Sequence, residues 1–207
     1  QGQQRTKNVE PQLVPLYSAY CADAIAFNSH YNRSSFLQGA AALLESLPDR
    51  LPSALIEKLE ESHVMPVPLE DFDAVPAPSG PKNILDVIWN HRWEYDKGPE
   101  LLLAIVREAI ARNLPLQFNI VGQQFRSQPA EFAEIRDLFD SPKDDNCAVN
   151  CTLGEFGYLD SRADYEALLW QGDIVLSTAS HDFQGLSIQE GMMRNCTPLV
   201  PDSLVYP

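Results

Sequence analysis

The sequence is poor in basic residues and has no long apolar run. Of its 207 residues, 15 are Lys or Arg and 29 are Asp or Glu, so the formal net charge is -14. Affinity for nucleic acids rests on Lys and Arg side chains that neutralise phosphates, so this balance argues against a phosphate-binding surface spread over the chain. It leaves room for a local basic pocket. No run of eighteen apolar residues occurs, and we therefore expect no membrane span.

Cysteines are few and scattered, at positions Cys21, Cys147, Cys151 and Cys196. This spacing does not fit a disulfide framework, and no second Cys or His pair stands at zinc spacing, so we predict no metal site. Cys21 and Cys196 lie in apolar stretches and are expected to be buried thiols. Residues 1–8 are polar, without the apolar core of a signal peptide. We expect a cytoplasmic protein whose numbering begins inside a longer chain.

The first third of the chain has the pattern of an α/β region. Helical spacing of apolar residues predicts helices over residues 10–22 and 32–47 and from residue 52, with a short strand at 24–27. We interpret residues 1–70 as the end of one Rossmann-like domain. Residues 71–81 are rich in Pro, Ala and Asp and are predicted to form a linker.

Beyond the linker, apolar strands and helices alternate regularly. The predicted strands are residues 83–89, 116–121, 148–153 or the stretch just after it, 173–177 and 197–200, and the predicted helices are residues 99–112, 129–139, 161–170 and 185–194. Such alternation is typical of a doubly wound parallel sheet. We assign residues 82–207 to a second Rossmann-like domain, and we expect at least one more strand and helix after residue 207.

Ligands of such sheets bind beyond the carboxyl ends of the strands, and three strand ends here carry candidate residues. After the first strand, Arg92 and Lys97 bracket a loop. Two cations that converge on a helix N-terminus suit a diphosphate. The alternative is that both are surface cations paired with Glu94 and Asp96, and the spacing does not decide between the two interpretations.

The second candidate segment is residues 177–190. Gly185 allows a ligand to approach the backbone, where the first turn of a helix offers free amides. Asp182 and Glu190 are too far apart to share a ligand on one continuous helix, but they reach one molecule if Asp182 lies in the loop and Glu190 in the second turn. A carboxylate accepts from two adjacent hydroxyls, as in a ribose or hexose. The alternatives are a helix cap for Asp182 and a solvated charge for Glu190.

The third candidate is a pair of loops, at Gly122 and at Gly157-Tyr158, which are suited to hold a base through backbone contacts. The alternative is that both glycines are simple turn residues. The sequence contains no GxGxxG, P-loop, HExxH or GxSxG motif, and its four histidines show no ligand spacing.

The pattern Arg92-x4-Lys97-Gly98, then Asp182-x7-Glu190, then Thr197-Pro198, resembles the retaining glycosyltransferases of the GT-B fold. That family commonly has Arg…Lys-Gly, Glu-x-Phe-Gly-x4-Glu and Gly-Thr-Pro. This sequence departs from it with Asp182 for the first Glu, Gln184 for the Phe, and Asn195-Cys196 before Thr197. The shorter Asp182 carboxylate puts the role of that position in question.

A narrower resemblance, to the tRNA-queuosine α-mannosyltransferase family, covers most of the chain. It rests on residues 89–97, 181–185 and 198–207, and on residues 27–36 at the end of the first region. The resemblance implies two Rossmann-like domains facing each other across a cleft, GDP-mannose as donor, and transfer to queuosine in tRNA with retention. It implies no obligatory metal.

The same resemblance implies roles for individual residues. Arg92 and Lys97 would neutralise the departing diphosphate, Glu190 would hold the ribose, and Asp182 would touch hydroxyls of the transferred sugar. The further donor-binding candidates are Gly122, Tyr158, His181, Phe183, Gln184, Gly185, Leu186 and Ser187. Residues 1–70 would be the end of the acceptor-side domain, and the acceptor site and any acid/base residue are expected to lie largely upstream of this chain. Two alternatives stay open: an enzyme with a sugar, lipid or small-molecule acceptor, and a non-catalytic nucleotide-binding module.

Overall fold

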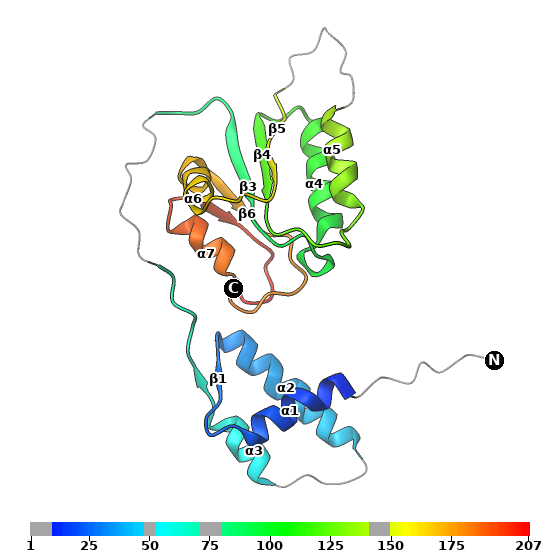
Figure 1. Cartoon of the computed structure of the whole chain (residues 1–207), viewed down its shortest axis with the longest axis vertical. Helices are drawn as coiled ribbons and strands as arrows, with labels where there is room; N and C mark the ends of the chain where they lie inside the picture. Colours follow the sequence, from blue (N-terminus) through cyan, green and yellow to red (C-terminus); the bar gives the residue numbers. More distant parts are fainter. Residues whose placement is uncertain (1–9, 48–52, 71–79, 141–149) are drawn as a thin grey trace, which may run out of the picture. The chain divides into compact units, whose positions relative to one another are not determined.

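The computed structural model describes residues 10–47, 53–70, 80–140 and 150–207 (Figure 1). Its contacts divide the chain into two compact units, Gln1–Pro68 (unit 1) and Leu69–Pro207 (unit 2). The predicted linker, residues 71–81, falls mainly on residues 71–79, which lie outside the described residues.

Unit 1 is a small α/β unit. Its elements are α1 (Glu10–Cys21), β1 (Ala26–Phe27), α2 (His30–Ser46), α3 (Ser53–Glu60) and β2 (His63–Val64), and the two strands pair in parallel. The helices pack through a core of buried apolar residues, namely Leu16, Ala19, Ala40, Leu43, Leu55 and Leu59. The prediction that Cys21 is buried is wrong: it is exposed, because it stands about 200° round the helix from buried Ala19.

Unit 2 contains a five-stranded sheet in the order β5-β4-β3-β6-β7, with every neighbouring pair parallel. Its strands are β3 (Leu85–Trp89), β4 (Leu116–Val121), β5 (Thr152–Gly157), β6 (Ile174–Leu176) and β7 (Thr197–Leu199). Helices α4 (Pro99–Ala111) and α5 (Glu131–Asp140) cover one face, and α6 (Arg162–Gln171) and α7 (Leu186–Met192) the other (Figure 1). The prediction of a doubly wound parallel sheet is confirmed.

Strand order creates a switch point between β3 and β6. The chain runs outward from β3 through β4 to β5, then crosses to β6 and β7 on the other side of β3. Two loops that diverge from neighbouring strand ends leave a crevice at such a point, where open α/β sheets bind ligands. Both loops carry candidate residues, Arg92 and Lys97 after β3 and residues 177–185 after β6.

Two elements differ from their predicted bounds. The uncertain strand is β5, in the later of the two predicted positions. Helix α7 spans only Leu186–Met192 instead of residues 185–194, because the chain turns at Met193 and Asn195 adopts a left-handed conformation with φ 66°. At seven residues, α7 is short, so its candidate site depends on individual first-turn groups more than on a long helix dipole.

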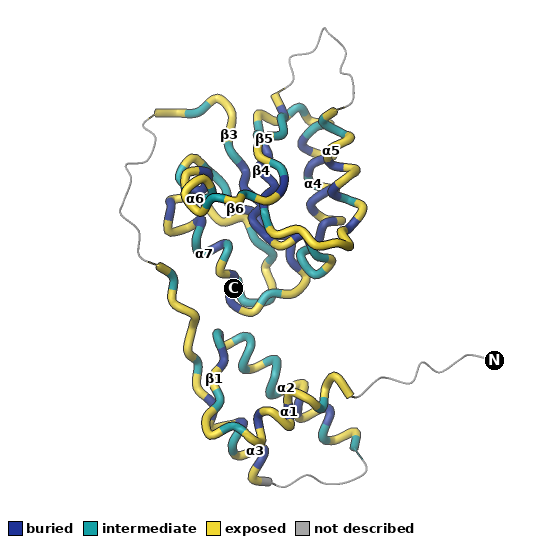
Figure 2. The backbone as a smooth tube through the Cα atoms, viewed as in Figure 1, coloured by how far each residue is buried: buried dark blue, intermediate teal, exposed yellow. Residues whose placement is uncertain are grey.

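Two tryptophans, Trp89 at the end of β3 and Trp93 in the loop after it, belong to the core. Trp89 and Trp93 are buried, and Trp93 stacks on Phe132 with ring centroids 4.1 Å apart. The Trp89 indole donates to Thr178 Oγ1 at 2.9 Å. Burial is densest in the central strands β3, β4 and β6 and on the inner side of α4 (Figure 2). The tryptophans therefore anchor both loops of the crevice to the core.

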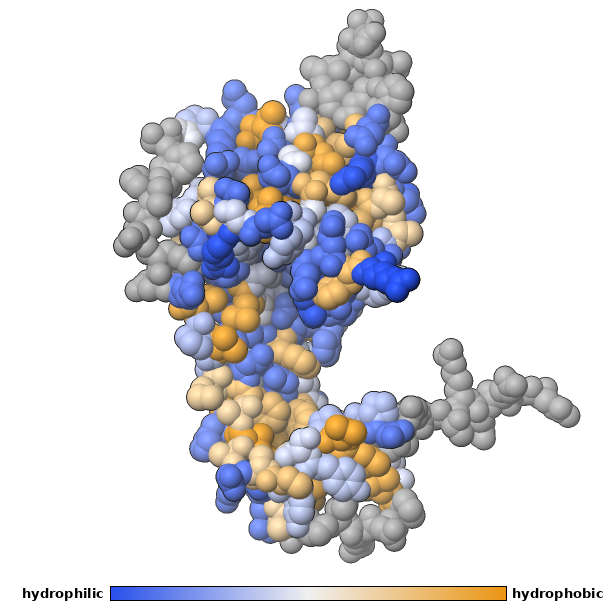
Figure 3. All heavy atoms as spheres, in the orientation of Figure 1, coloured by the Kyte–Doolittle hydropathy of each residue, from blue (hydrophilic) through white to orange (hydrophobic). Residues whose placement is uncertain are grey.

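In the described part of the chain, no helix combines the length and apolar character needed to cross a membrane. The face of unit 2 visible in Figure 3 is mostly hydrophilic, with apolar side chains interspersed.

Candidate functional site

A cavity of about 550 Å³ opens beyond the carboxyl ends of β3, β4 and β5, within the size range of small-molecule sites. It is lined by Asn90, His91, Arg92, Val121, Gly122, Gln123, Tyr158, Leu159, Asp160, Ser161, Arg162, Tyr165 and Glu190. Of the twelve predicted site residues, Arg92, Gly122, Tyr158 and Glu190 line this cavity.

The Glu190 carboxylate is held in the cavity wall by two donors from α6. Tyr165 Oη donates to Glu190 Oε2 at 2.6 Å, and Arg162 donates to Oε1 at 3.1 Å. Burial and the neighbouring Glu190 raise the pKa of Tyr165, so its hydroxyl keeps its proton and remains a donor. Glu190 is therefore a positioned carboxylate and not a freely solvated helix charge.

Sequence reasoning missed Arg162 and Tyr165. Their spacing of three residues puts them on one helix face, which is a signal for a shared partner, but the partner comes from another helix. The backbone of the same site is also fixed, since the buried guanidinium of Arg194 donates to the Glu190 carbonyl at 3.0 Å.

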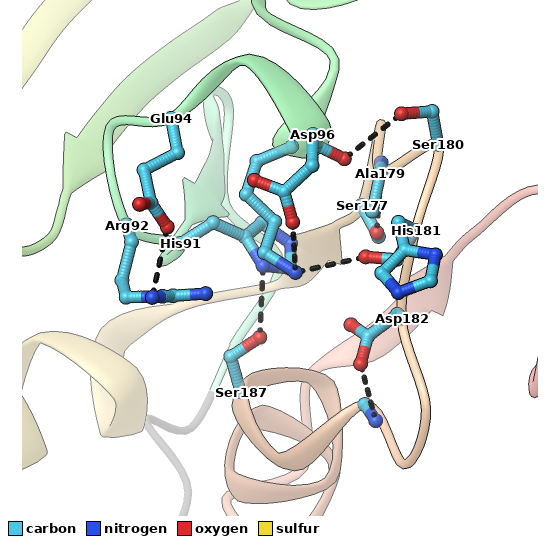
Figure 4. Close-up of polar contacts among 12 residues, drawn as sticks. His91, Arg92, Glu94, Asp96, Ser177, Ala179, Ser180, His181, Asp182 and Ser187 are labelled. Atoms are coloured by element: carbon cyan, nitrogen blue, oxygen red, sulfur yellow. Dashed lines mark hydrogen bonds and ion pairs between the residues drawn. The ribbon is translucent and has the colours of Figure 1, made fainter. Parts of the chain in front are cut away.

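Asn90 and His91 connect β3 to α7. Asn90 Nδ2 donates to Tyr165 Oη at 2.8 Å and to the Ser187 carbonyl at 2.9 Å. His91 Nδ1 lies 3.1 Å from Ser187 Oγ (Figure 4). Burial and the nearby charge of Lys97 lower the pKa of His91 to about 4, so the imidazole is neutral at pH 7. The predicted site residue Ser187 therefore contacts Asn90 and His91, two residues that line the cavity.

The loops after β3 and β6 are bonded to each other at a loop junction formed by Asp96, Lys97, Thr178, Ser180 and His181. Lys97 Nζ donates to the His181 carbonyl at 2.9 Å, and the amides of Ser180 and His181 donate to the Asp96 carbonyl. Ser180 Oγ donates to the same carbonyl at 3.1 Å (Figure 4). Thr178 Oγ1 donates to the Lys97 carbonyl at 2.7 Å. The side chain of Lys97 is only 11% exposed, so this cation is built into the crevice.

Arg92 and Lys97 both have the acidic partners that the alternative interpretation gave them. Arg92 pairs with Glu94 at 2.9 Å, and Lys97 with Asp96 at 3.2 Å. Arg92 is 53% exposed and lines the cavity, whereas Lys97 lies in the loop junction. The pair of Arg92 with Glu94 is exposed and therefore weak, which leaves the Arg92 guanidinium available to an anion in the cavity. A diphosphate bound by both cations stays a prediction.

Asp182 lies in a packed group with Ser177, Gly185 and Tyr206, the Asp182 cluster. Its Oδ1 accepts from the Gly185 amide at 3.0 Å, and its Oδ2 accepts from Tyr206 Oη at 2.9 Å. Ser177 Oγ lies 2.9 Å from Tyr206 Oη. Burial opposes the charge of Asp182, but the Gly185 amide, Lys97 and Tyr206 outweigh it and lower the pKa of the carboxyl. Asp182 thus orders the loop before α7: it accepts from the amide of Gly185, which is itself the N-cap residue, so Asp182 is not the helix cap of the alternative interpretation.

The remaining candidates surround this cluster. The His181 and Phe183 rings meet edge to face at 4.4 Å, Gln184 is buried, and Leu186 is partly exposed. Gly185 adopts φ 71°, and a Cβ there would lie 2.9 Å from the Tyr206 ring. Sequence reasoning did not single out Tyr206, although it lies in a segment that carries the family resemblance.

Gly122 lines the cavity, and position 122 requires glycine for a steric reason. Its φ is 152°, and a Cβ would lie 1.8 Å from the His91 carbonyl oxygen. Tyr158, 60% exposed, lies across the cavity at the end of β5. Within the described ranges, no three His, Cys, Asp or Glu side chains are grouped to hold a metal ion, and Cys147 lies outside those ranges.

The chain is similar to known proteins over nearly its whole length. Residues 1–69 match the family model "tRNA-queuosine alpha-mannosyltransferase N-terminal". A Drosophila melanogaster tRNA-queuosine alpha-mannosyltransferase is 32% identical over 203 residues, which cover 93% of this chain and 51% of that protein. The chain thus spans about half the length of this curated relative. The resemblance to this family is confirmed.

Solved structures agree on the fold. TarM superposes with a TM-score of 0.56 at 18% identity, covering 93% of this chain and 32% of TarM. A trehalose-6-phosphate synthase, studied with bisubstrate glycomimetics, gives 0.61 at 16% identity and covers 94% of this chain and 49% of its own. The expected α/β fold of GT-B type is confirmed.

Proposed function

We propose that the protein is a retaining glycosyltransferase that transfers mannose from GDP-mannose to queuosine in tRNA, with unit 2 as its donor-binding part. The observation that supports this most directly is the Glu190 carboxylate, held by Tyr165 and Arg162 in the wall of a cavity beside the switch point of the sheet. The similarity to a tRNA-queuosine alpha-mannosyltransferase supports the reaction and the acceptor.

The Glu190 carboxylate has capacity for a nucleotide ribose. An ionised carboxylate accepts about four hydrogen bonds, and Tyr165 and Arg162 occupy one acceptor position on each oxygen. One position per oxygen is left, which matches the two adjacent hydroxyls of a ribose. The base would then extend toward Gly122 and Tyr158 in the same cavity.

The diphosphate would lie between Arg92, Lys97 and the first-turn amides of α7, at Leu186 and Ser187. Those amides have no carbonyl partner within the helix. Asp182 would meet hydroxyls of the sugar while it orders the loop that leads into α7. The rate enhancement then comes from charge stabilisation on the leaving diphosphate in a site that excludes water, without a protein nucleophile from this chain and without an obligatory metal.

The proposal also makes a demand on the rest of the protein. Because the chain carries a net charge of -14, the surface that binds tRNA would have to be basic and lie outside it. The acceptor-side groups would lie there as well. Action on tRNA places the protein in the cytoplasm.

The test is transfer by the full-length protein, offered GDP-, UDP- and ADP-sugars together with tRNA that contains queuosine. We expect GDP-mannose to add one hexose to the queuosine nucleoside, read by mass spectrometry, and the same tRNA without queuosine to stay unmodified. Donor hydrolysis without transfer to tRNA would favour a sugar, lipid or small-molecule acceptor. Donor binding without turnover of any kind would favour a non-catalytic module.

A further inference from the structure

Asn90 stands where the loop after β3 meets both the cavity and α7. It is 8% exposed and lines the cavity. Its side-chain nitrogen is fully used, because Nδ2 donates to Tyr165 Oη and to the Ser187 carbonyl. An amide nitrogen carries two hydrogens, so both are committed.

These two bonds fix which way the amide faces. The Ser187 carbonyl can only accept, so the group that faces it must be the nitrogen, and the Asn90 side chain is not reversible in this setting. Tyr165 Oη gives its own proton to Glu190, so it in turn accepts from Asn90. The direction of every bond in the series Asn90, Tyr165, Glu190 is thereby determined.

The same constraint leaves the Asn90 oxygen without a partner. Oδ1 is buried and accepts no hydrogen bond from any residue that the structure describes. A buried acceptor without a donor is costly and uncommon in folded proteins. Here it belongs to a side chain that lines the cavity, next to a carboxylate suited to hydroxyls, so a bound molecule that shifts the cavity wall slightly would supply the missing donor.

We propose that Asn90 is a ligand-binding residue that acts in two ways: Oδ1 accepts a hydrogen bond from a ribose hydroxyl of the bound nucleotide sugar, and Nδ2 positions Tyr165 and through it Glu190. This rests on the proposed function, because it takes the cavity to be the donor site. It adds a specific acceptor that discriminates among ligands by the ribose hydroxyl they present.

The test is a double-mutant cycle on the full-length protein, with GDP binding measured by calorimetry. Tyr165→Phe removes the hydroxyl that links Asn90 to Glu190 but leaves Oδ1 in place, since the Ser187 carbonyl still orients the amide. Asn90→Leu removes both functions in a side chain of similar size. We expect Tyr165→Phe to weaken GDP binding about threefold, and Asn90→Leu about tenfold to thirtyfold, from typical net values of single hydrogen bonds.

The decisive comparison is Asn90→Leu in the Tyr165→Phe background. A further loss of about fivefold with GDP, but not with the deoxy form that lacks the paired hydroxyl, supports direct contact between Oδ1 and the ligand, since loss of the bond to the Ser187 carbonyl would weaken both alike. No further loss would overturn the proposal, because Asn90 would then act only through Tyr165. Asn90→Ala, which adds no bulk, repeats the measurement, and unfolding temperatures without ligand identify any variant that has lost its fold.

Failure of the proposed function looks different. If wild-type protein binds neither GDP nor GDP-mannose, or if Glu190→Gln leaves GDP binding unchanged, the cavity is not the donor site and the contact to Asn90 falls with it. If Glu190→Gln weakens GDP binding and the Asn90 variants do not, only the assignment of Asn90 is overturned. A comparison of GDP with its 2′-deoxy and 3′-deoxy forms then identifies the hydroxyl that donates a hydrogen bond to Oδ1. Asn90→Leu should abolish the preference for GDP over the form that lacks this hydroxyl.

Discussion

Two carboxylates of one motif, Asp182 and Glu190, have opposite surroundings. Glu190 faces a cavity of about 550 Å³ and is held by donors that leave part of its acceptor capacity free. Asp182 lies in a packed cluster, where it accepts from the Gly185 amide just before α7 and from Tyr206. The difference shows that one half of the motif is arranged for a ligand, while the other half holds the loop that supports it.

The largest loss of stability is expected at Gly98, where the loops after β3 and β6 touch. Gly98→Ala would place a Cβ 1.9 Å from the Thr178 carbonyl oxygen, at a left-handed φ of 65°. Both the clash and the backbone strain act at the contact between the two loops, and we expect the free energy of unfolding to fall by about 4 kcal/mol. Chemical denaturation measures this.

The matched control is Gly39→Ala in α2 of unit 1, where a Cβ meets nothing within 4 Å. There the substitution should stabilise the helix by up to about 1 kcal/mol. Equal effects at the two glycines would show that the loop junction tolerates a side chain at position 98. The Asp182 side of the site would then not be as tightly packed as the structure indicates.

The second prediction concerns His91, which lines the cavity and contacts Ser187 of α7. Its folded pKa of about 4 is below the ordinary 6.5, so between these values the unfolded state binds more protons and stability falls as pH falls. The full loss is about 3 kcal/mol, at 1.36 kcal/mol per pKa unit. His91→Asn should flatten the dependence of unfolding free energy on pH between 7 and 4.

Ser187→Ala is the control for His91, because it removes the hydroxyl partner but keeps the buried imidazole. We expect it to retain the pH slope of the wild type. If His91→Asn leaves the slope unchanged, protonation of other groups accounts for the loss of stability at low pH, and the buried imidazole of His91 does not contribute to it.

The third prediction tests the open side. Glu190→Gln keeps the shape of the side chain but removes the charge that Arg162 and a ribose would meet. Hydrogen bonds to a charged group contribute about 1.5–3 kcal/mol, so GDP binding should weaken about thirtyfold by calorimetry. Asp182→Asn should weaken it less and lower stability more, since the carboxylate accepts from the Gly185 amide and the Tyr206 hydroxyl in a packed cluster. The reverse ranking would exchange the roles of the two carboxylates.

The sequence predicts the frame of this site but not its contacts. The sheet of unit 2 follows from continuous apolar strands, and β5 was uncertain because Gly154 and Glu155 are exposed within it. The positions of Asp182 in a loop and Glu190 in a helix follow from helical spacing. The link from Tyr165 to Glu190 depends on how α6 packs against α7, and no local pattern encodes that packing.

The smallest expected effect belongs to Tyr206→Phe. The ring that covers Gly185 stays, while the bonds to Asp182 and Ser177 are lost. Burial raises the pKa of Tyr206, so it is a neutral donor at all ordinary pH values, and its loss should lower the free energy of unfolding by about 1 kcal/mol. Because Tyr206 does not line the cavity, GDP binding should change less than threefold.

Tyr158→Phe, at an exposed cavity residue, is the control and should leave stability unchanged. A large loss of binding in Tyr206→Phe at unchanged stability would mean that the orientation of Asp182 matters to the ligand, and the two carboxylates would then act on it together.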